Sequence, residues 1–407
     1  MKAKFYFLPL LLLYVAIILL AYHNNLQDDE IRYVTFARNL SQGFYSPADN
    51  INLWSGPGYP LLLLPFVILK LDGLPIKILN AFLLFFAVIY FYNTLKIYLD
   101  QKYALYISYI LGLYPPILRD LHMILTETFV CFLICGFIYH FCKLLQHEAT
   151  NRFHLVIASL YLAFIALTKI IFGYVILIVI AIFFVVSAIR RKKSVMKVLA
   201  VNIIAMLFCL PYLFYTYSLT GKMFYWGTSG GMSLYWMSTP YSGELGNWCD
   251  WSQVYAQPQL YANHHQFFDR IAPLDNVQRD EEFKKQGLRN IWAHPQKFLA
   301  NWMCNLGRLL FSYPFSYKLQ SPTTFFYLIP NMFLVVLSIL CIYPTITRYH
   351  NVPFEIIILL LISVIYLGGS TLLSAYERQL RPIFPILFLW ISFTLLRIME
   401  IRIRAAD

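Results

Sequence analysis

The feature that most constrains this chain is a series of long, almost uncharged apolar stretches. A transmembrane helix needs about 20 mostly apolar residues. Stretches of that kind lie at roughly 5–22, 75–98, 122–144, 170–189, 195–218, 323–344, 353–373 and 380–399, with shorter candidates at 103–118 and 154–168. The pattern predicts an all-α polytopic membrane protein with about ten transmembrane helices.

Composition excludes other classes of protein. Hydrophobic residues make up 59% of the chain and charged residues 13%, whereas soluble globular domains have about 25% charged residues. A water-soluble enzyme and a disordered chain are therefore excluded. The net charge of +12 comes from short basic tracts beside apolar stretches, which is typical of helix orientation by the positive-inside rule. We expect no nucleic-acid partner, because no basic patch is interleaved with polar readers.

The stretch 58–72 decides the number of crossings. It contains Pro60 and Pro65 and ends at Asp72. Counted as a span it gives eleven crossings and forces the tract 190–193 and the C-terminus outside. With ten crossings the basic tracts all become cytoplasmic. These tracts contain Lys2, Lys4, Lys96, Lys102, Lys143, Arg152, Arg190, Arg191, Lys192, Lys193, Arg348, Arg402 and Arg404. We therefore predict ten crossings, cytoplasmic termini, and a re-entrant or interfacial segment at 58–72.

This topology divides the chain into three parts. An N-terminal membrane module spans 1–218 and carries an acidic first outer loop at 23–74. A large extracytoplasmic loop follows at 219–322, and a C-terminal membrane module at 323–407. The turns at 119–121, Lys169 and 374–379 also face outward. Loops as long as 219–322 are usually functional.

Cysteine usage gives no recognisable set of metal ligands. Cys131 and Cys135 share a helix face without a His or carboxylate at ligand spacing. Cys249 and Cys304 lie in the large loop, and whether they pair is left open. The neighbouring His264 and His265 are interpreted as loop decoration.

The first outer loop opens with three carboxylates, Asp28-Asp29-Glu30. Downstream, apolar residues recur every third position, which predicts a short amphipathic helix lying in the interface. These residues are Ile31, Val34, Ala37 and Leu40. Taken alone, the tract favours a capping aspartate on a surface helix.

A wider pattern surrounds this acidic entry. It begins Asp29-Glu30-x-x-Tyr33-x-x-x-Ala37-x-x-Leu40-x-x-Gly43 and continues with Gly56-Pro57-Gly58-Tyr59-Pro60. Further elements follow in order at Leu125-Thr126-Glu127, Thr168-Lys169, 229–235, 281–298 and Glu377-Arg378-x-x-Arg381-Pro382-x-x-Pro385. Together they resemble the polyprenyl-phosphate-sugar glycosyltransferases of the C-type (GT-C) superfamily, particularly glycosyltransferase family 39 and the bacterial lipopolysaccharide-core and aminoarabinose transferases. Lys169 replaces the family's Arg, Ser233 its Asn and Gln379 its Tyr.

The resemblance implies a reaction. A sugar, hexose or pentose, would pass with inversion from a polyprenyl-phosphate donor to a glycan, lipid or protein acceptor. The reaction would take place on the outer face of a bacterial inner membrane, with a lipopolysaccharide-type acceptor favoured. Alternatives are a lipid-linked sugar transporter or flippase, and a protein O-mannosyltransferase.

The resemblance also implies roles for residues. Asp29 would be the general base, since an acceptor hydroxyl needs one, and Glu127 its partner. Two carboxylates in one pocket repel, so a divalent metal or a neighbouring Lys or Arg is expected between them; which of these is left open. The implied substrate-binding residues are Glu30, Tyr33, Tyr59, Lys169, Arg378 and Arg381. The aromatic run from Tyr235 to Trp251 is explained equally by stacking on sugars and by an interfacial belt.

Overall fold

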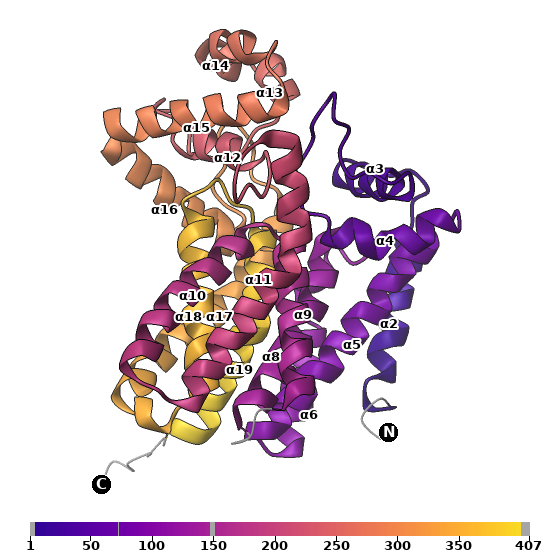
Figure 1. Cartoon of the computed structure of the whole chain (residues 1–407), viewed down its shortest axis with the longest axis vertical. Coiled ribbons are helices and arrows are strands. Elements are labelled where there is room, and N and C mark those ends of the chain that lie inside the picture. Colours follow the sequence, from indigo (N-terminus) through magenta and orange to yellow (C-terminus); the bar gives the residue numbers. More distant parts are fainter. Residues whose placement is uncertain (1–4, 72, 147–150, 400–407) are drawn as a thin grey trace.

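The computed structural model of the protein describes residues 5–71, 73–146 and 151–399. Within these ranges the chain is helical and contains no β-strand. A bundle of long helices carries a separate group of shorter helices at one end (Figure 1). The prediction of an all-α polytopic membrane protein is confirmed. The tracts at Lys2, Lys4, Arg402 and Arg404, and the boundary residue Asp72, lie outside the described residues.

Ten helical segments form the bundle. Seven are long and apolar enough to cross a membrane on their own. They are α5 (Leu74–Tyr98), α8 (Thr126–Gln146), α10 (Ile171–Ile189), α11 (Lys193–Thr220), η1–α17 (Pro322–Thr324 and Phe325–Thr347), α18 (Phe354–Thr371) and the continuous run η3–α19–η4 (Glu377–Ile383, Phe384–Phe393 and Thr394–Ile398). The shorter segments are α2 (Leu8–Leu20), α6 (Gln101–Gly112) and α9 (Arg152–Thr168). Ten segments in the described part of the chain thus run along the bundle, and α2 and α6, with 13 and 12 residues, are shorter than the about 17 residues that a crossing needs.

The segment predicted at 103–118 is shorter than expected. α6 ends at Gly112, and a separate turn of helix, α7, covers Pro115–Leu118. The cause is local, because a residue that precedes a proline is driven out of the helical region. Tyr114 has φ −65° and ψ 117°, which is extended. The prolines therefore interrupt the helix between Gly112 and Pro115.

The ambiguous stretch 58–72 forms only α4 (Gly58–Ile68). Eleven residues of helix are about 16 Å long, roughly half of a hydrocarbon core about 30 Å thick. α4 packs against α3 (Asp29–Ser41), and both lie across the end of the bundle rather than along it (Figure 1). This agrees with an interfacial segment and ten crossings.

The stripe predicted on α3 is wrong in its details. The buried residues are Glu30, Tyr33, Val34, Phe36 and Ala37, and Ile31 is exposed. Because an α-helix turns about 100° per residue, residues spaced strictly by three drift around it, and Ile31 and Leu40 point about 180° apart. The buried face follows 30, 33, 34 and 37 instead, and it includes the acidic Glu30.

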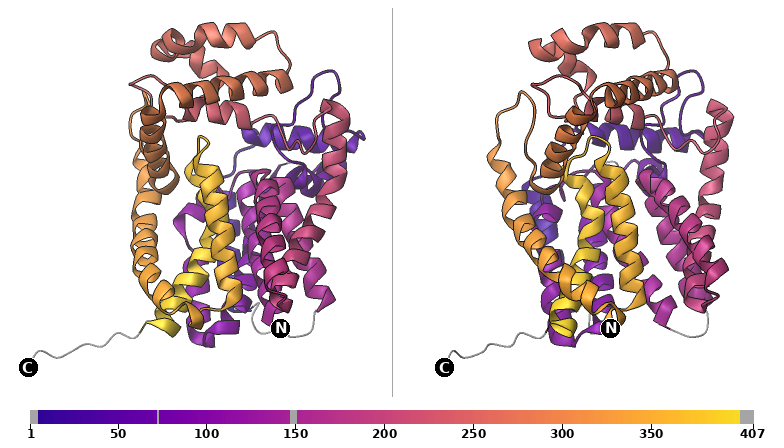
Figure 2. Two further views of the ribbon diagram at one scale, coloured as in Figure 1. Left: turned by 60° about the vertical axis from the view of Figure 1, so that its left-hand side comes forward. Right: turned by 90° about the vertical axis from the view of Figure 1, so that its left-hand side faces the viewer.

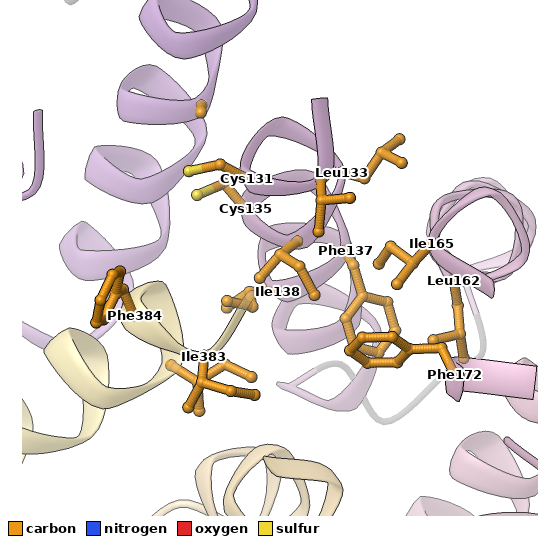
Figure 3. Packing of buried hydrophobic residues seen from close by; sticks show 14 of the residues in the cluster. Cys131, Leu133, Cys135, Phe137, Ile138, Leu162, Ile165, Phe172, Ile383 and Phe384 are labelled. Carbon is orange, nitrogen blue, oxygen red and sulfur yellow. The ribbon is translucent and has the colours of Figure 1, made fainter. Parts of the chain in front are cut away.

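The bundle shares one apolar core, and α8 lies in its middle. Side chains of α8 are buried on most sides of the helix, against α5, α9, η3, α18 and α19. Figure 3 shows Cys131, Cys135 and Phe137 of this helix among apolar neighbours. The first residues of α8, Thr126 and Glu127, are therefore surrounded by other helices of the bundle.

The residues between α11 and η1, 221–321, form a helical unit that we call the head. It contains α12 (Gly230–Met237), α13 (Trp251–Ala256), α14 (Pro258–Ile271), α15 (Asn276–Ala293) and α16 (Pro295–Phe311). It stands over one end of the bundle in all three views (Figures 1 and 2). The head has its own buried cluster around Tyr235, Trp236, Phe268 and Phe283.

Two interpretations of the loop sequence need correction or completion. His264 is not loop decoration: it is buried on α14, with Nδ1 2.6 Å from the Tyr235 hydroxyl and Nε2 2.9 Å from a Glu244 carboxylate oxygen. Adjacent residues on a helix face different directions, so His265 is the more exposed of the pair. Cys249 and Cys304 are both free thiols.

Candidate active site

The charged residues singled out in the sequence meet at the head end of the bundle. Asp29 begins α3, Glu127 lies in the first turn of α8, and Lys169 lies between α9 and α10. Arg378 and Arg381 lie on η3, the 3₁₀ helix that opens the last membrane segment. Asp29 and Arg378 are 349 positions apart in sequence and are directly hydrogen-bonded.

Asp29 lies between two guanidinium groups. Arg32 Nη2 is 2.7 Å from Asp29 Oδ1, and Arg378 Nη1 is 2.7 Å from Asp29 Oδ2. Burial by itself would raise the pKa of the Asp29 carboxyl, but the charges of Arg378 and Arg32 and the hydrogen bond from Arg378 outweigh it. They hold this pKa below its ordinary value, against the opposing charge of nearby Glu127. Asp29 is therefore ionised in the free protein.

Glu127 forms a second ion pair close by. Its carboxylate is almost fully buried, and Oε1 lies 2.9 Å from Lys169 Nζ. Thr126 Oγ1 also donates to Glu127 Oε2 at 3.3 Å. A buried carboxylate is tolerated only when it is paired and hydrogen-bonded. The cation expected between the two acidic residues is therefore supplied by basic side chains, Lys169 for Glu127 and the two arginines for Asp29.

A third group of charges surrounds Arg381 and includes residues that sequence reasoning passed over. Arg381 donates to Asp120 Oδ2, and Arg119 lies 2.9 Å from Glu377 Oε1. Arg119 also donates to the hydroxyl of Tyr327 on α17. Arg119 also approaches its neighbour Asp120, but that contact is longer, at 3.8 Å. Asp120 carried no motif signal, whereas Arg32 could have been found as the i+3 partner of Asp29 on a helix.

Glu30 lies beside Asp29 but faces the protein interior. It is fully buried, and its oxygens accept from the backbone N–H groups of Gln27 and Ile124 at 3.0 and 2.8 Å. Lys77 of α5 approaches Glu30 Oε1 at 3.6 Å. Glu30 thus joins α3 to α5 and to the segment before α8, and so fixes the position of Asp29.

Tyr33 and Tyr59 pack edge to face, with ring centroids 5.2 Å apart. Tyr59 is the second residue of α4, directly after the sequence Gly56-Pro57-Gly58. A Cβ at Gly56 would lie 2.0 Å from the Leu167 carbonyl oxygen, and one at Gly58 would lie 2.4 Å from Thr168 Oγ1. Only glycine permits this approach. The motif therefore seats α4, with Tyr59, directly on the turn that carries Lys169.

Unpaired buried polar atoms gather here. Among the described residues, Arg32 Nε, Tyr59 Oη, Glu377 Oε2 and Arg381 Nε are buried and have no hydrogen-bond partner. Leaving such an atom unpaired costs about 1–3 kcal/mol, and unsatisfied groups in native structures call for an explanation such as an unfilled ligand site. Four of the nine such atoms among the described residues thus belong to the charged site and to Tyr59.

The donor set does not suit a metal ion. In the described parts of the chain no three His, Cys, Asp or Glu side chains come together as ligands. Asp29 and Glu127 already contact Arg32, Arg378 and Lys169. A divalent ion would have to displace these cations, so we derive no step through a metal.

Comparison with known proteins identifies the class of fold. No protein-family model matches this sequence, and no curated protein matches it. The archaeal oligosaccharyltransferase AglB from Archaeoglobus fulgidus, in complex with an inhibitory peptide and a dolichol-phosphate, superposes with a TM-score of 0.52 and 15% identity. The match covers 96% of this chain and 50% of that chain.

Two further structures give similar matches. The A. fulgidus oligosaccharyltransferase in complex with Zn and sulfate has a TM-score of 0.52 and 14% identity, over 95% of this chain and 48% of that one. ArnT from Cupriavidus metallidurans bound to undecaprenyl phosphate has a TM-score of 0.44 and 13% identity, over 95% and 77%.

The protein is thus a polytopic membrane protein in which the side chains of Asp29, Glu127, Lys169, Arg378 and Arg381 gather at one end of a helical bundle. Its fold is that of the A. fulgidus oligosaccharyltransferase, in agreement with the GT-C fold expected from the sequence. The chain spans about half the length of the oligosaccharyltransferase it matches.

Proposed function

We propose that the protein is an integral-membrane glycosyltransferase that moves a hexose or pentose from a polyprenyl-phosphate donor to a glycan or lipid acceptor of the cell envelope. The reaction takes place on the outer face of a bacterial inner membrane. The observation that carries the proposal is the Asp29–Arg378 contact of 2.7 Å, made beside the buried Glu127–Lys169 pair. A carboxylate and several cations meet there, at the end of an apolar bundle where a lipid-linked sugar can arrive.

The cations serve the leaving group. Transfer breaks the bond between the anomeric carbon and the phosphate oxygen through an oxocarbenium-like transition state, and the polyprenyl phosphate leaves as an anion. Preorganised positive charge in a site shielded from water stabilises that departure. Arg378 is half exposed, so it reaches an incoming phosphate, and Lys169 and Arg381 add charge behind it. Arg suits bidentate phosphate contact.

Asp29 serves the attacking group. In the free protein its two arginines make it a weak base, because they stabilise the carboxylate. A donor phosphate that takes over Arg378 removes one of these partners, and the pKa of Asp29 then rises. Binding of the donor thereby creates the base that accepts the proton of the acceptor hydroxyl. Attack on the side of the sugar opposite to the phosphate inverts the anomeric centre.

The remaining residues position these groups. Glu127 holds Lys169 and balances its charge, Glu30 fixes α3, and Tyr59 presents an unpaired buried hydroxyl next to Tyr33. None of them needs to exchange a proton during the reaction. Tyr59 Oη is free to donate to a sugar or phosphate oxygen.

Substitution of Asp29 tests the proposal. We expect Asp29→Asn to lower transfer by about 10²–10⁴-fold, the usual contribution of a general base. The protein in lipid nanodiscs is incubated with polyprenyl-phosphate-linked hexoses, pentoses and amino sugars and with envelope glycolipids, and the products are read by mass spectrometry. Asp28→Asn, at the exposed neighbouring carboxylate, is the matched control and should transfer at the wild-type rate.

The same experiment separates the alternatives. A transporter or flippase would leave the sugar–phosphate bond intact, so no free polyprenyl phosphate would accumulate with any donor. A protein O-mannosyltransferase would release polyprenyl phosphate only with a peptide acceptor. A folded Asp29→Asn protein that transfers sugar as fast as the wild type would show that Asp29 is not the base.

A further inference from the structure

A cavity of about 330 Å³ lies where the first loop meets the head. Its walls come from α3, from the loop that follows it, and from α12, α13 and α15. The lining residues are Arg32, Asn52, Trp54, Thr228, Met232, Trp248, Asp250, Trp251, Asn276, Arg279, Asp280 and Phe283. Its volume falls at the lower end of the range of small-molecule sites, about 300–1,000 Å³.

The walls of this cavity are held by contacts between the two segments. The Thr228 N–H donates to the Leu53 carbonyl at 3.0 Å, and Asn276 Nδ2 donates to the Ile51 carbonyl at 2.9 Å. Gly231 N–H donates to Asp280 Oδ1 at 2.7 Å, so the base of α12 is fixed to α15. The cavity is therefore built into the fold.

Three indole rings line the cavity, and all three are only partly buried. Trp54, Trp248 and Trp251 are half-buried, whereas Trp226 and Trp236 are fully buried core residues. Trp54 meets Trp248 edge to face at 6.2 Å. Half-exposed aromatic faces are the surfaces on which the C–H groups of a sugar ring stack, with apolar contact on one side and solvent on the other.

Arg32 connects this cavity to the base. It lines the cavity, lies 6.0 Å above the Trp54 ring, and donates to Asp29 Oδ1 at 2.7 Å. Its buried Nε has no partner among the described residues. Arg32 therefore lies between the cavity and Asp29, which is not itself a lining residue.

The cavity carries no net charge that would select an anion. Asp250 Oδ1 accepts from Gln253 N–H, and Asp280 Oδ1 accepts from Gly231 N–H. Arg32 is paired with Asp29, and Arg279 Nε donates to the Ile271 carbonyl at 3.3 Å while its guanidinium covers the Trp251 ring. Two carboxylates and two guanidinium groups balance, and the remaining polar side chains include the amides of Asn52 and Asn276 and the hydroxyl of Thr228.

We propose that this cavity is the acceptor subsite and that it binds a neutral glycan, one sugar ring of which stacks on Trp54 and Trp248 while its hydroxyl faces Asp29. The inference rests on the proposed function and deepens it, because it selects a glycan among the acceptors. The head and the first loop bind the acceptor, and the end of the bundle binds the lipid-linked donor.

Binding and turnover are measured separately. Intrinsic tryptophan fluorescence of the protein in nanodiscs is titrated with neutral hexose trisaccharides, and in parallel with phosphorylated trisaccharides of the same sequence. We expect the neutral series to change the fluorescence and Trp54→Ala to raise the dissociation constant by about tenfold. In transfer assays the same variant should raise the acceptor KM by a similar factor. Trp292→Ala is the matched control, since this indole is 86% exposed on α15 away from the cavity.

The outcomes distinguish this inference from the function on which it rests. Neutral glycans that bind and lose affinity in Trp54→Ala support the subsite even if no donor is turned over, a result that would count against the transferase alone. Transfer with an acceptor KM that is the same in Trp54→Ala and wild type overturns the subsite and leaves the transferase standing. Binding of phosphorylated but not neutral trisaccharides also overturns it, as does transfer to a peptide alone.

Discussion

At the scale of residues, the site is organised by shared partners. Asp29 is bonded to Arg32 on the side of the cavity and to Arg378 on the side of η3. In the proposed mechanism the donor contacts Arg378 and the acceptor contacts Arg32, so the binding of either substrate changes the surroundings of the same carboxylate. Because a carboxylate between two guanidinium groups is a weak base, the proposed reaction depends on one of these bonds being exchanged for a bond to substrate.

This arrangement predicts the pH dependence of the reaction. The base works in its ionised form, so kcat/KM falls as pH falls through the pKa of Asp29 in the folded protein. That pKa is depressed, so the acid limb should lie below the ordinary aspartate value of about 3.9. In Arg32→Gln one of the two stabilising charges is lost, and the limb should move up by about one pH unit.

The measurement is the pH profile of kcat/KM, which reports the free enzyme. The stability linked to Asp29 has the same sign: it is present above the pKa of the unfolded chain and is lost as pH falls through the lower folded value. An acid limb that stays in place in Arg32→Gln would show that Arg32 does not control the ionisation of Asp29.

At the scale of elements, close backbone approaches determine where the charged residues meet. α4 rests on the end of α9 because Gly56 and Gly58 have no side chain. The same turn holds Lys169, which faces Glu127 at the beginning of α8. A small displacement of α4 therefore moves the buried ion pair as well as Tyr59.

We expect Gly58→Ala to disturb this contact. Its Cβ would lie 2.4 Å from Thr168 Oγ1 and 2.9 Å from the backbone of Leu167, and overpacking of this kind costs about 1–3 kcal/mol. Thermal unfolding in nanodiscs should shift downward and transfer should slow. Gly230→Ala is the control, because nothing lies within 4 Å of its added Cβ. Equal unfolding temperatures for the two variants would contradict the proposed role of the motif.

Elements also show which parts of the site could be predicted from sequence. The order of the motifs identified Asp29, Glu127, Lys169, Arg378 and Arg381, which the fold brings to one end. The pair Asp120–Arg381 could not be found, because it joins positions 261 apart and no motif marks Asp120. His264 was missed for another reason: a pair of adjacent histidines gives no indication of which one faces a buried glutamate.

At the scale of the whole molecule, the sequence predicted the bundle well and its interruptions less well. Apolar length identified the long spans, whereas the break after Gly112 depended on the local effect of two prolines. The head was predicted only as a long loop. Its core relies on contacts among Tyr235, Phe268 and Phe283, which come from three helices separated by polar surface and leave no long hydrophobic run.

The proposed orientation in the membrane has its own test. α11 begins at Lys193 and ends at the head, so the tract 190–193 lies at the opposite end of the bundle, as the positive-inside rule requires for a cytoplasmic face. We expect a reporter that is active only outside the cytoplasm to work when fused after Arg270 in the head and to fail when fused after Lys193. The opposite result would place the site on the cytoplasmic side.

The contacts of Glu30 with two other segments have a consequence for the position of Asp29. This side chain bonds α3 to the backbone at Ile124 and approaches Lys77 of α5. Folding alone therefore fixes the position of α3 and of Asp29, the proposed base. These contacts exist before either substrate arrives, so the position of the proposed base does not depend on substrate binding.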